Sequence, residues 1–278
     1  MRTGDRTRRL PLVLLVALFG LGCQPKIVIE GVVEDVHGKT LPGVAVSLAG
    51  TPVQALSDGI GRYQLACPPD ILKALLGAPA PEILAIKTGY APRRIPMTLA
   101  GEGQALTAPL LRLWPLPAAE GVFFLVGQRY VRLSPASLKQ YRTRELGPRF
   151  GTKKDTTSST LHPRPRIFLH KMKPYDAQLT RLEQIDAAEL DENREGPEAK
   201  AGEFPERVWV AAASVAVSSV VLDEENRALL ELRLEESLVP GIYAVHWGGL
   251  DGHLSTDSRV FLFQVKEPDA ERKPSPPE

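Results

Sequence analysis

Two histidines and two aspartates near the C-terminal end are the residues whose types and spacing best fit a chemical site. His246 is followed by Asp251, His253 and Asp257. Imidazole nitrogens and carboxylate oxygens are common zinc ligands, so a hairpin that brought these side chains together would predict a metal-dependent hydrolase using His246 and His253. The glycines around Asp251 favour turns, however, and His246 lies in an apolar stretch, which favours a buried, hydrogen-bonded histidine.

Three aromatic residues form a second candidate site. Trp209, Tyr243 and Trp247 lie in apolar stretches of the sequence. Exposed, these rings would provide a stacking platform for sugars and predict a carbohydrate-binding surface protein. Aromatic residues within apolar strands are also typical of core packing, and the two interpretations differ in whether the rings are exposed.

Other patterns point away from catalysis. No serine lies in a Gly-x-Ser-x-Gly nucleophile elbow, and Gly59-x-Gly61 lacks the strand-to-helix context of a phosphate loop. Asp35 and Asp58 lie among turn residues, where a carboxylate caps backbone N–H groups. We therefore expect no catalytic residue, no metal and no cofactor, and predict that the chain is not an enzyme.

Short strands must position these side chains. The 278 residues include 25 prolines and 23 glycines, a composition that favours many turns. Apolar residues recur at every second position in segments such as Val44–Leu48, which marks strands with one buried face. We predict an all-β chain with two β-sandwich domains, residues 27–116 and 120–266, the second immunoglobulin-like or a related sandwich. The sequence Trp114-Pro115-Leu116-Pro117 is expected to form a stiff junction between them.

The first domain contains an ordered series of strand and turn residues. The series is Gly31, Val33, Asp35, Gly38, Leu41, Gly43, Val44 and Val46, then Asp58, Gly61 and Tyr63, then Lys87, Gly89 and Tyr90. In order and spacing it resembles the carboxypeptidase regulatory-like domain, a transthyretin-like sandwich of seven strands. The resemblance implies a structural or accessory module without chemistry of its own. The stretch Pro68–Pro81 departs from the pattern and is expected to form a short helix or an apolar loop.

The second domain begins with a predicted hairpin whose Gly127-Gln128 loop fits a type II′ turn. From Ser134 to Arg166 the chain is basic and is expected to be irregular, as part of a long charged loop region at about 134–205. Its cations include Lys139, Arg142, Arg144, Arg149, Lys153 and Lys154. This loop is either a solvated segment or the contact surface for an acidic partner, and we take it as the candidate contact surface. Residues 267–278 are charged and proline-rich and are expected to be a disordered tail.

The N-terminal residues have the parts of a bacterial export signal. Four arginines precede the apolar stretch Leu10–Leu21, which is shorter than the roughly 20 residues of a membrane-spanning helix. Gly20-Leu21-Gly22-Cys23 resembles the lipobox of bacterial lipoproteins, although the usual pattern has leucine three positions before the cysteine and a small residue two before. The resemblance implies removal of residues 1–22 and attachment of lipid, including palmitate, to Cys23. An ordinary signal peptide with an incidental cysteine is the alternative. Gln24 in place of an aspartate implies the outer membrane.

Charge and cysteine content limit the remaining function classes. The net charge is +1, and beyond the N-terminus the basic residues are dispersed and form no continuous block, so nucleic-acid binding has no support. Cys67 lies in no zinc or redox spacing and is expected to be a small core residue. We expect a non-enzymatic envelope lipoprotein, anchored by Cys23 in the outer membrane and facing the periplasm or the surface. It would act as a binding or structural module with a protein or glycan partner.

Overall fold

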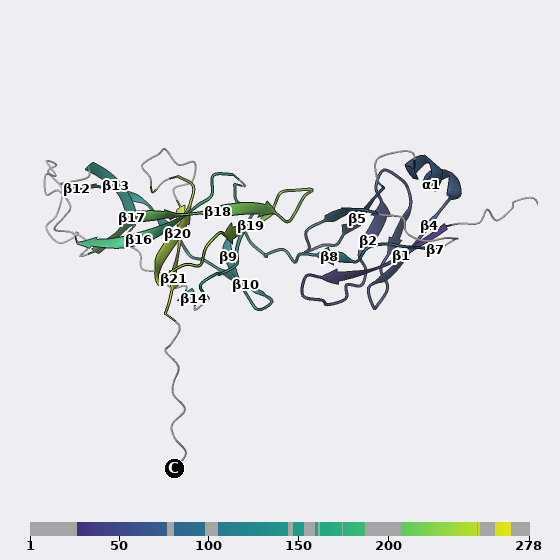
Figure 1. The fold of residues 1–278 in the computed structure, drawn as a ribbon, viewed down its shortest axis with the longest axis horizontal. Coiled ribbons are helices and arrows are strands. Elements are labelled where there is room, and N and C mark those ends of the chain that lie inside the picture. The colour runs from purple at the N-terminus through teal and green to yellow at the C-terminus, as the bar shows by residue number, and fades with distance from the viewer. Residues whose placement is uncertain are drawn as a thin grey trace, which may run out of the picture.

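The computed structural model describes residues 27–76, 81–97, 105–143, 147–152, 159–160, 162–173, 175–186, 207–248, 250 and 259–267. Within these ranges the regular structure consists of strands β1 to β21 and one short helix, α1. The prediction of an all-β chain is therefore confirmed. The strands form two β-sandwiches that follow one another along the long axis of the molecule (Figure 1).

The first sandwich contains two sheets built from residues 27–113. Its strands are β1 (Ile27–Asp35), β2 (Ala45–Leu48), β3 (Gln54–Leu56), β4 (Arg62–Cys67), β5 (Glu82–Ile86), β6 (Arg93–Pro96), β7 (Ala105–Thr107) and β8 (Leu111–Leu113). One sheet has the order β4-β1-β7, with β8 also paired to β1, and the other has the order β3-β2-β5-β6. Strand β1 runs antiparallel to β4 and parallel to β7 and β8.

Alternate side chains fill the space between these two sheets. In β4, Tyr63, Leu65 and Cys67 are buried while the residues between them are exposed. Val46 of β2 and Ile83 of β5 belong to the same core cluster from the opposite sheet. The period of two thus buries one face of each strand, and Cys67 is a core residue as predicted.

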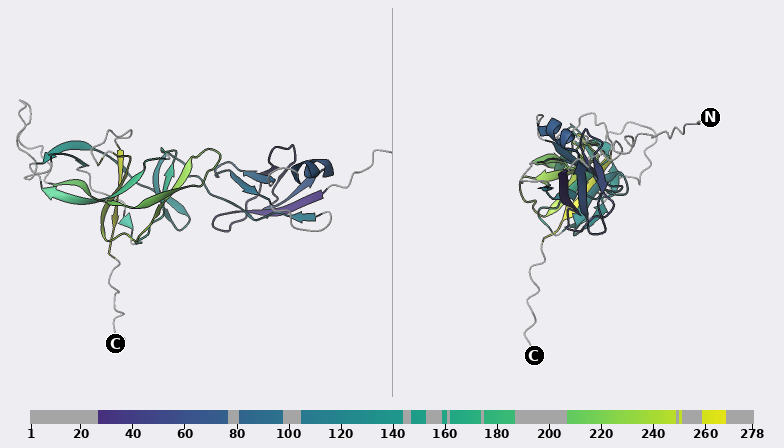
Figure 2. Two further views of the ribbon diagram at one scale, coloured as in Figure 1. Left: turned by 45° about the horizontal axis from the view of Figure 1, so that its top comes forward. Right: turned by 90° about the vertical axis from the view of Figure 1, so that its right-hand side faces the viewer.

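Helix α1 (Pro69–Leu76) forms in the stretch for which the sequence predicted either a short helix or an apolar loop. Proline at its first position and Asp70 in its first turn both favour a helix start. Ile71 packs against the first core. Figure 2 shows α1 at the end of the first sandwich away from the second. In the part of the chain that the structure describes, no helix is long and apolar enough to cross a membrane.

The second sandwich also contains two sheets. Its strands are β9 (Gly121–Val126), β10 (Arg129–Arg132), β11 (Pro135–Ser137), β12 (Lys139–Thr143), β13 (Gly147–Thr152), β14 (Ser159–Thr160), β15 (Ile167–His170), β16 (Gln178–Asp186), β17 (Arg207–Val215), β18 (Val217–Val221), β19 (Leu229–Leu234), β20 (Gly241–His246) and β21 (Arg259–Val265). The five-stranded sheet has the order β10-β9-β15-β19-β18. The eight-stranded sheet has the order β11-β21-β20-β16-β17-β13-β12, with β14 also paired to β21.

Aromatic rings pack the core between these sheets. The ring of Phe263 lies 5.0 Å from Phe124 in an edge-on contact and 5.5 Å from Tyr243 in a stacked one. Trp247 contacts Phe261 with ring centroids 6.1 Å apart. Such tilted and offset contacts are the arrangements that aromatic pairs favour.

The hairpin of β9 and β10 has the predicted two-residue loop. Val126 pairs with Arg129, which leaves Gly127 and Gln128 in the turn. Gly127 has a φ of +60°, whereas Gln128 is absent from the described residues with positive φ. This combination fits the expected type II′ turn.

The prediction of an irregular loop from Ser134 onward is wrong for much of that region. Strands β11 to β14 lie in this region, and β15 and β16 follow before residue 187. Strands β12 and β13 form an antiparallel hairpin, and β13 adds to β17. A strand near a sheet edge is specified largely by backbone pairing with its neighbour, and charged residues are favoured there because they discourage pairing with other chains. Of the six cations named above for this region, Lys139, Arg142 and Arg149 are on strands, and Arg144, Lys153 and Lys154 lie outside the described residues.

Strands β17 and β18 connect the two sheets of the second sandwich. They are separated by Ala216 alone, yet β17 belongs to the eight-stranded sheet and β18 to the five-stranded sheet. The two strands follow one another along the long axis of the molecule (Figure 1). One nearly continuous segment therefore crosses from one layer to the other.

Candidate functional site

The structure places one of the four candidate zinc ligands. His246 is fully buried in β20, with its Nε2 atom 2.8 Å from the Thr180 hydroxyl. Asp251, His253 and Asp257 lie outside the described residues. Among the described residues, no three histidine, cysteine, aspartate or glutamate side chains are grouped closely enough to hold a metal ion. His246 is thus a hydrogen-bonded core residue.

Two of the three candidate sugar-binding aromatics are also core residues. Trp247 is 3% exposed, and its indole N–H donates to the Lys173 carbonyl at 3.1 Å. Tyr243 is 1% exposed, and its hydroxyl donates to the Val239 carbonyl at 2.8 Å. A sugar platform that uses these two rings is therefore wrong, because neither ring reaches the surface.

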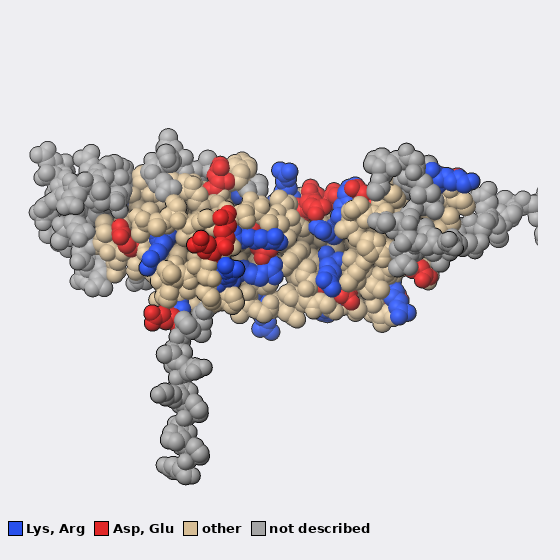
Figure 3. Space-filling model, in the orientation of Figure 1, with Lys and Arg blue, Asp and Glu red and all other residues tan. Residues whose placement is uncertain are grey.

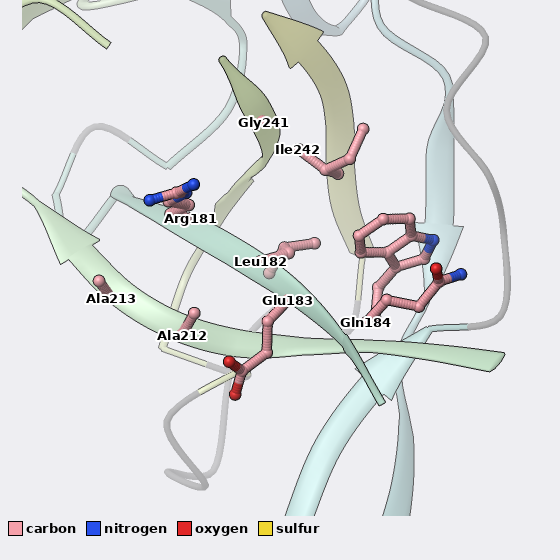
Figure 4. Close-up of a pocket in the computed structure, with 9 residues that line it drawn as sticks. Arg181, Leu182, Glu183, Gln184, Ala212, Ala213, Gly241 and Ile242 are labelled. Carbon is pink, nitrogen blue, oxygen red and sulfur yellow. The ribbon is translucent and has the colours of Figure 1, made fainter. Parts of the chain in front are cut away.

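The third aromatic, Trp209, is half-buried and lines a hollow of about 470 Å³. Three small residues and five longer side chains form the rest of the lining (Figure 4): Arg181, Leu182, Glu183, Gln184, Ala212, Ala213, Gly241 and Ile242. Figure 4 shows Arg181 and Gln184 on opposite sides of Leu182. The hollow thus has polar groups around an apolar centre.

A β-bulge accounts for the position of this hollow. Arg181 pairs with Ala213 across β16 and β17, but Leu182 pairs with Ala211, so Ala212 has no partner in the opposite strand. A bulge of this kind bends the strand and redirects side chains. Because Ala212, Ala213 and Gly241 are small, space remains above the backbone.

The segment between the sandwiches makes specific contacts with both of them. On the side of the first sandwich, the Ala91 N–H donates to the Trp114 carbonyl, and the Leu116 N–H donates to the Gly89 carbonyl, both at 2.8 Å. These bonds extend the pairing of the first sandwich into the predicted stiff junction. Prolines on either side of Leu116 further restrict the backbone.

On the side of the second sandwich, Trp114 packs against the five-stranded sheet. Its ring lies 5.5 Å from the Phe168 ring, and the Arg166 guanidinium lies 4.9 Å above the indole. Arg166 also pairs with Glu231 at 2.6 Å, where the Glu231 side chain is 6% exposed. A cation held over an aromatic face and tied to a largely buried carboxylate has little freedom to move.

Two further hydrogen bonds attach the junction to the second sandwich. The Tyr130 hydroxyl donates to the Pro115 carbonyl at 2.9 Å, and His170 Nδ1 lies 2.8 Å from the Ala119 carbonyl oxygen. Burial raises the pKa of Tyr130 to about 12; Arg166 lowers that pKa and Glu231 raises it. The hydroxyl therefore remains a hydrogen-bond donor at neutral pH.

Ion pairs join the two sandwiches directly. Arg93 on β6 pairs with Glu224 at 2.6 Å, and Arg94 pairs with Glu225 at 2.8 Å. Figure 3 shows basic and acidic side chains together where the two sandwiches meet. The hydrogen bond from Arg94 lowers the pKa of Glu225. The buried carboxylate of Asp223 accepts a hydrogen bond from the Asn226 N–H at 2.9 Å, which orders the acidic turn.

The candidate aspartates of the first sandwich cap turns, as predicted. One Asp35 carboxylate oxygen accepts from the backbone N–H groups of His37 and Lys39 at 2.8 and 2.9 Å. One Asp58 oxygen accepts from Ile60 and Arg62 at 3.0 and 2.8 Å. Both carboxylates therefore stabilise turns of the backbone.

The sequence predicted a junction at Trp114-Pro115-Leu116-Pro117 but not the side chains that contact it. Arg93 and Arg94 lie 131 positions before the glutamates with which they pair. Adjacent basic and adjacent acidic residues are complementary, but that signal does not say which of many charged residues will meet.

No family model and no curated protein matches the chain. Among solved structures it is similar to an N-terminal and a C-terminal interface mutant of a type II cohesin–X-dockerin complex from Acetivibrio cellulolyticus. Identity to these is 16% and 17%, over 32% and 38% of this chain and 58% and 64% of the other, with TM-scores of 0.24 and 0.25. It is also similar to the major pilin subunit of Bacillus cereus, at 11% identity over 86% of this chain and 69% of that one, with a TM-score of 0.19. The chain spans less than two thirds of the two cohesin–dockerin chains, and likeness of this extent does not identify a family.

Proposed function

We propose that this chain is a non-enzymatic envelope lipoprotein whose two sandwiches form one stiff binding or structural module. The observation that supports the stiff module is the double attachment of the junction. Its backbone is hydrogen-bonded to the first sandwich, while Trp114 is held against the second by Phe168 and Arg166. A module of this kind keeps a binding surface at a fixed distance from its anchor.

The residues of the first-sandwich motif support a structural role. A methyl group on Gly31 would overlap the Tyr63 ring, and one on Gly61 would lie 2.5 Å from the Val33 carbonyl oxygen. Gly61 also has a φ of +77°, which favours glycine. Together with the capping by Asp35 and Asp58, these contacts explain how the residues of the motif stabilise the fold. They support our assignment of residues 27–116 to the carboxypeptidase regulatory-like domains.

The proposed anchor lies close to the first strand. Cys23 is outside the described residues, and β1 begins at Ile27. Because an extended chain spans at most about 3.6 Å per residue, these four steps cover about 14 Å. Lipid on Cys23 would hold the first sandwich near the membrane surface, and Gln24 supports the outer membrane as its location.

Distance measurement between spin labels tests the stiff module. One label is placed at Asp70 of α1 and one at Ser214 of β17, both exposed positions in different sandwiches. We expect a single narrow distance distribution, because the junction is fixed on both sides. Trp114→Ala removes the indole from Phe168 and Arg166 and should broaden the distribution. The exposed substitution Arg129→Ala serves as the control and should leave it narrow. A broad distribution in the unaltered protein would rule out the stiff module.

A further inference from the structure

In the part of the chain that the structure describes, β18 is the last strand of the five-stranded sheet and pairs with β19 alone. We infer that its other edge, here called the free edge, is a docking site for an extended segment of another protein, which adds to this sheet as a new strand. The inference rests on the proposed function, since it names the surface through which the module would bind. A sheet edge presents unpaired backbone N–H and C=O groups, and these pair readily with another strand.

Strand β18 lacks the features that protect the other edges. Its sequence from Val217 to Val221 contains valine and serine alone. Among the described edge strands of more than three residues, β4, β6, β10 and β12 each carry arginine, lysine or proline. Charged and proline residues discourage added strands. The edge formed by β18 is therefore the one best suited to accept a partner.

The hydrogen-bond pattern identifies the groups that are available. Leu222 and Ala216 are bonded to β19 through the Leu229 carbonyl and the Glu235 N–H. Bonded and non-bonded positions alternate along an antiparallel pair, so residues 218 and 220 also point their backbone groups to β19. The N–H and C=O groups of Val217, Ser219 and Val221 consequently point to the free edge.

The side chains at these three positions define the chemistry of the partner. Val217 and Val221 are half-buried and pack against the core between the sheets together with Leu234, and Ser219 is exposed. An added strand would place every second side chain beside them. We therefore expect an uncharged extended segment of about five residues, with small or β-branched side chains facing the core and no proline at the bonded positions.

The direction of β18 favours a different protein over a second copy of this chain. Two copies related by a two-fold axis would pair their β18 edges antiparallel. Because β18 follows the long axis of the molecule and the first sandwich lies beyond one end of this strand (Figure 1), the first sandwiches of the two copies would then extend in opposite directions. Two molecules that are anchored through Cys23 and extend away from one membrane cannot adopt that arrangement.

Cysteine accessibility tests the docking site in the full-length protein. Ser219→Cys places a thiol on the face that an added strand covers, and Ser218→Cys places one on the opposite face as a matched control. In detergent-purified protein, both thiols should react with a membrane-impermeant maleimide. In envelope fragments of the same cells, we expect the reaction at position 219 to slow about tenfold, with less than a twofold change at 218. Equal rates at 219 in both samples would overturn the docking site.

A second variant tests whether backbone pairing causes the protection. Ser219→Pro removes an N–H that points to the free edge and leaves the bonds to β19 intact. A thiol introduced by Val217→Cys should be protected in envelopes when Ser219 is retained. It should become accessible when Ser219→Pro is added, provided that the melting temperature shows folded protein. Persistent protection in the proline variant would contradict strand addition. Oxidative formation of dimers linked through Ser219→Cys would instead identify a second copy as the partner.

The same samples separate this inference from the proposed function. A palmitate analogue reports the anchor independently of the maleimide. Protein that carries the palmitate label but has an accessible thiol at position 219 would contradict the docking site and support the lipid anchor. Protein without the palmitate label would contradict the anchor.

Discussion

The Tyr63 side chain lies across Gly31 in the neighbouring strand. The two residues are paired in the β1–β4 ladder, and the Tyr63 ring occupies the space that a side chain on Gly31 would need. Tyr63 is 2% exposed, and its hydroxyl has no hydrogen-bond partner among the described residues. The contact therefore leaves no room for a side chain at position 31, and it buries the Tyr63 hydroxyl without a hydrogen bond.

Gly31→Ala should destabilise the protein by about 1–3 kcal/mol, because the added methyl group overlaps a buried ring. Gly59→Ala is the matched control in the same sandwich, since Gly59 has open space around its Cα and a φ that other residues adopt. That control should change the unfolding free energy by less than about 0.5 kcal/mol. Urea denaturation measures both. Equal effects of the two substitutions would contradict the close packing of Tyr63.

Tyr63→Phe should remove a pH dependence of stability. Burial raises the pKa of Tyr63 from 10.0 to about 12. Folding thus favours the neutral phenol, so this contribution is complete below pH 10 and is lost as pH rises towards 12, by about 1.4 kcal/mol per pH unit at most. At neutral pH the variant should be as stable as the unaltered protein, or more stable by about 1 kcal/mol, because it loses an unpaired buried hydroxyl. Urea denaturation from pH 9 to 12 checks this, and identical slopes for the two proteins would count against it.

At this scale the sequence predicts local contacts better than distant ones. The turn aspartates were predictable because Asp35 and Asp58 cap N–H groups two and four positions away. The partner of His246 was not, because Thr180 lies 66 positions earlier in another strand. Burial of Trp247 was predicted as one of two alternatives, and choosing between them required the position of its strand in the sandwich.

At the scale of elements, apolar alternation identified most strands with a buried face. Strand β2 (Ala45–Leu48) lies within the expected segment Val44–Leu48. Strands β12 and β13 were missed because backbone pairing with a neighbour places them, and such pairing leaves little trace in side-chain periodicity. The hollow beside Trp209 was missed for a related reason, since a bulge depends on register.

The ion pairs between β6 and the β18–β19 turn should each contribute little to the free energy of unfolding, but the coupling between two paired residues should be measurable. The Arg93 and Glu224 side chains are 38% and 45% exposed. Exposed pairs contribute about 0.2–1 kcal/mol and are screened by salt. A double-mutant cycle with Arg93→Glu and Glu224→Arg should give a coupling within that range at low salt, and the reversed pair should restore stability. A coupling that is unchanged in about 1 M salt would indicate packing in place of charge.

At the scale of the whole molecule, the junction decides how the two sandwiches act. Separate cores lie on its two sides, and Trp114 and Leu116 contribute to a third cluster on the five-stranded sheet. The sequence predicted two sandwiches and a stiff junction, but not the surface on which the junction lies. That surface depends on strand order, and strand order depends on contacts between distant segments.

Metabolic labelling with a palmitate analogue tests the anchor. The unaltered protein should be labelled and should fractionate with the outer membrane, since the acyl chains contribute about 0.8 kcal/mol per buried methylene. Cys23→Ser should abolish labelling. Cys67→Ala controls for thiol chemistry elsewhere and should retain the label, because Cys67 is buried in the first core. Label that persists in Cys23→Ser would place the lipid at another residue.

The parallel neighbours β1 and β8 have a mechanical consequence. Val33, Glu34 and Asp35 pair in register with Leu111, Arg112 and Leu113. A pulling force that enters at Ile27 and leaves at Leu113 drives these two strands past each other along their length. The ladder bonds then bear the load together instead of opening one at a time, so the first sandwich should resist stretching better along this direction than across it.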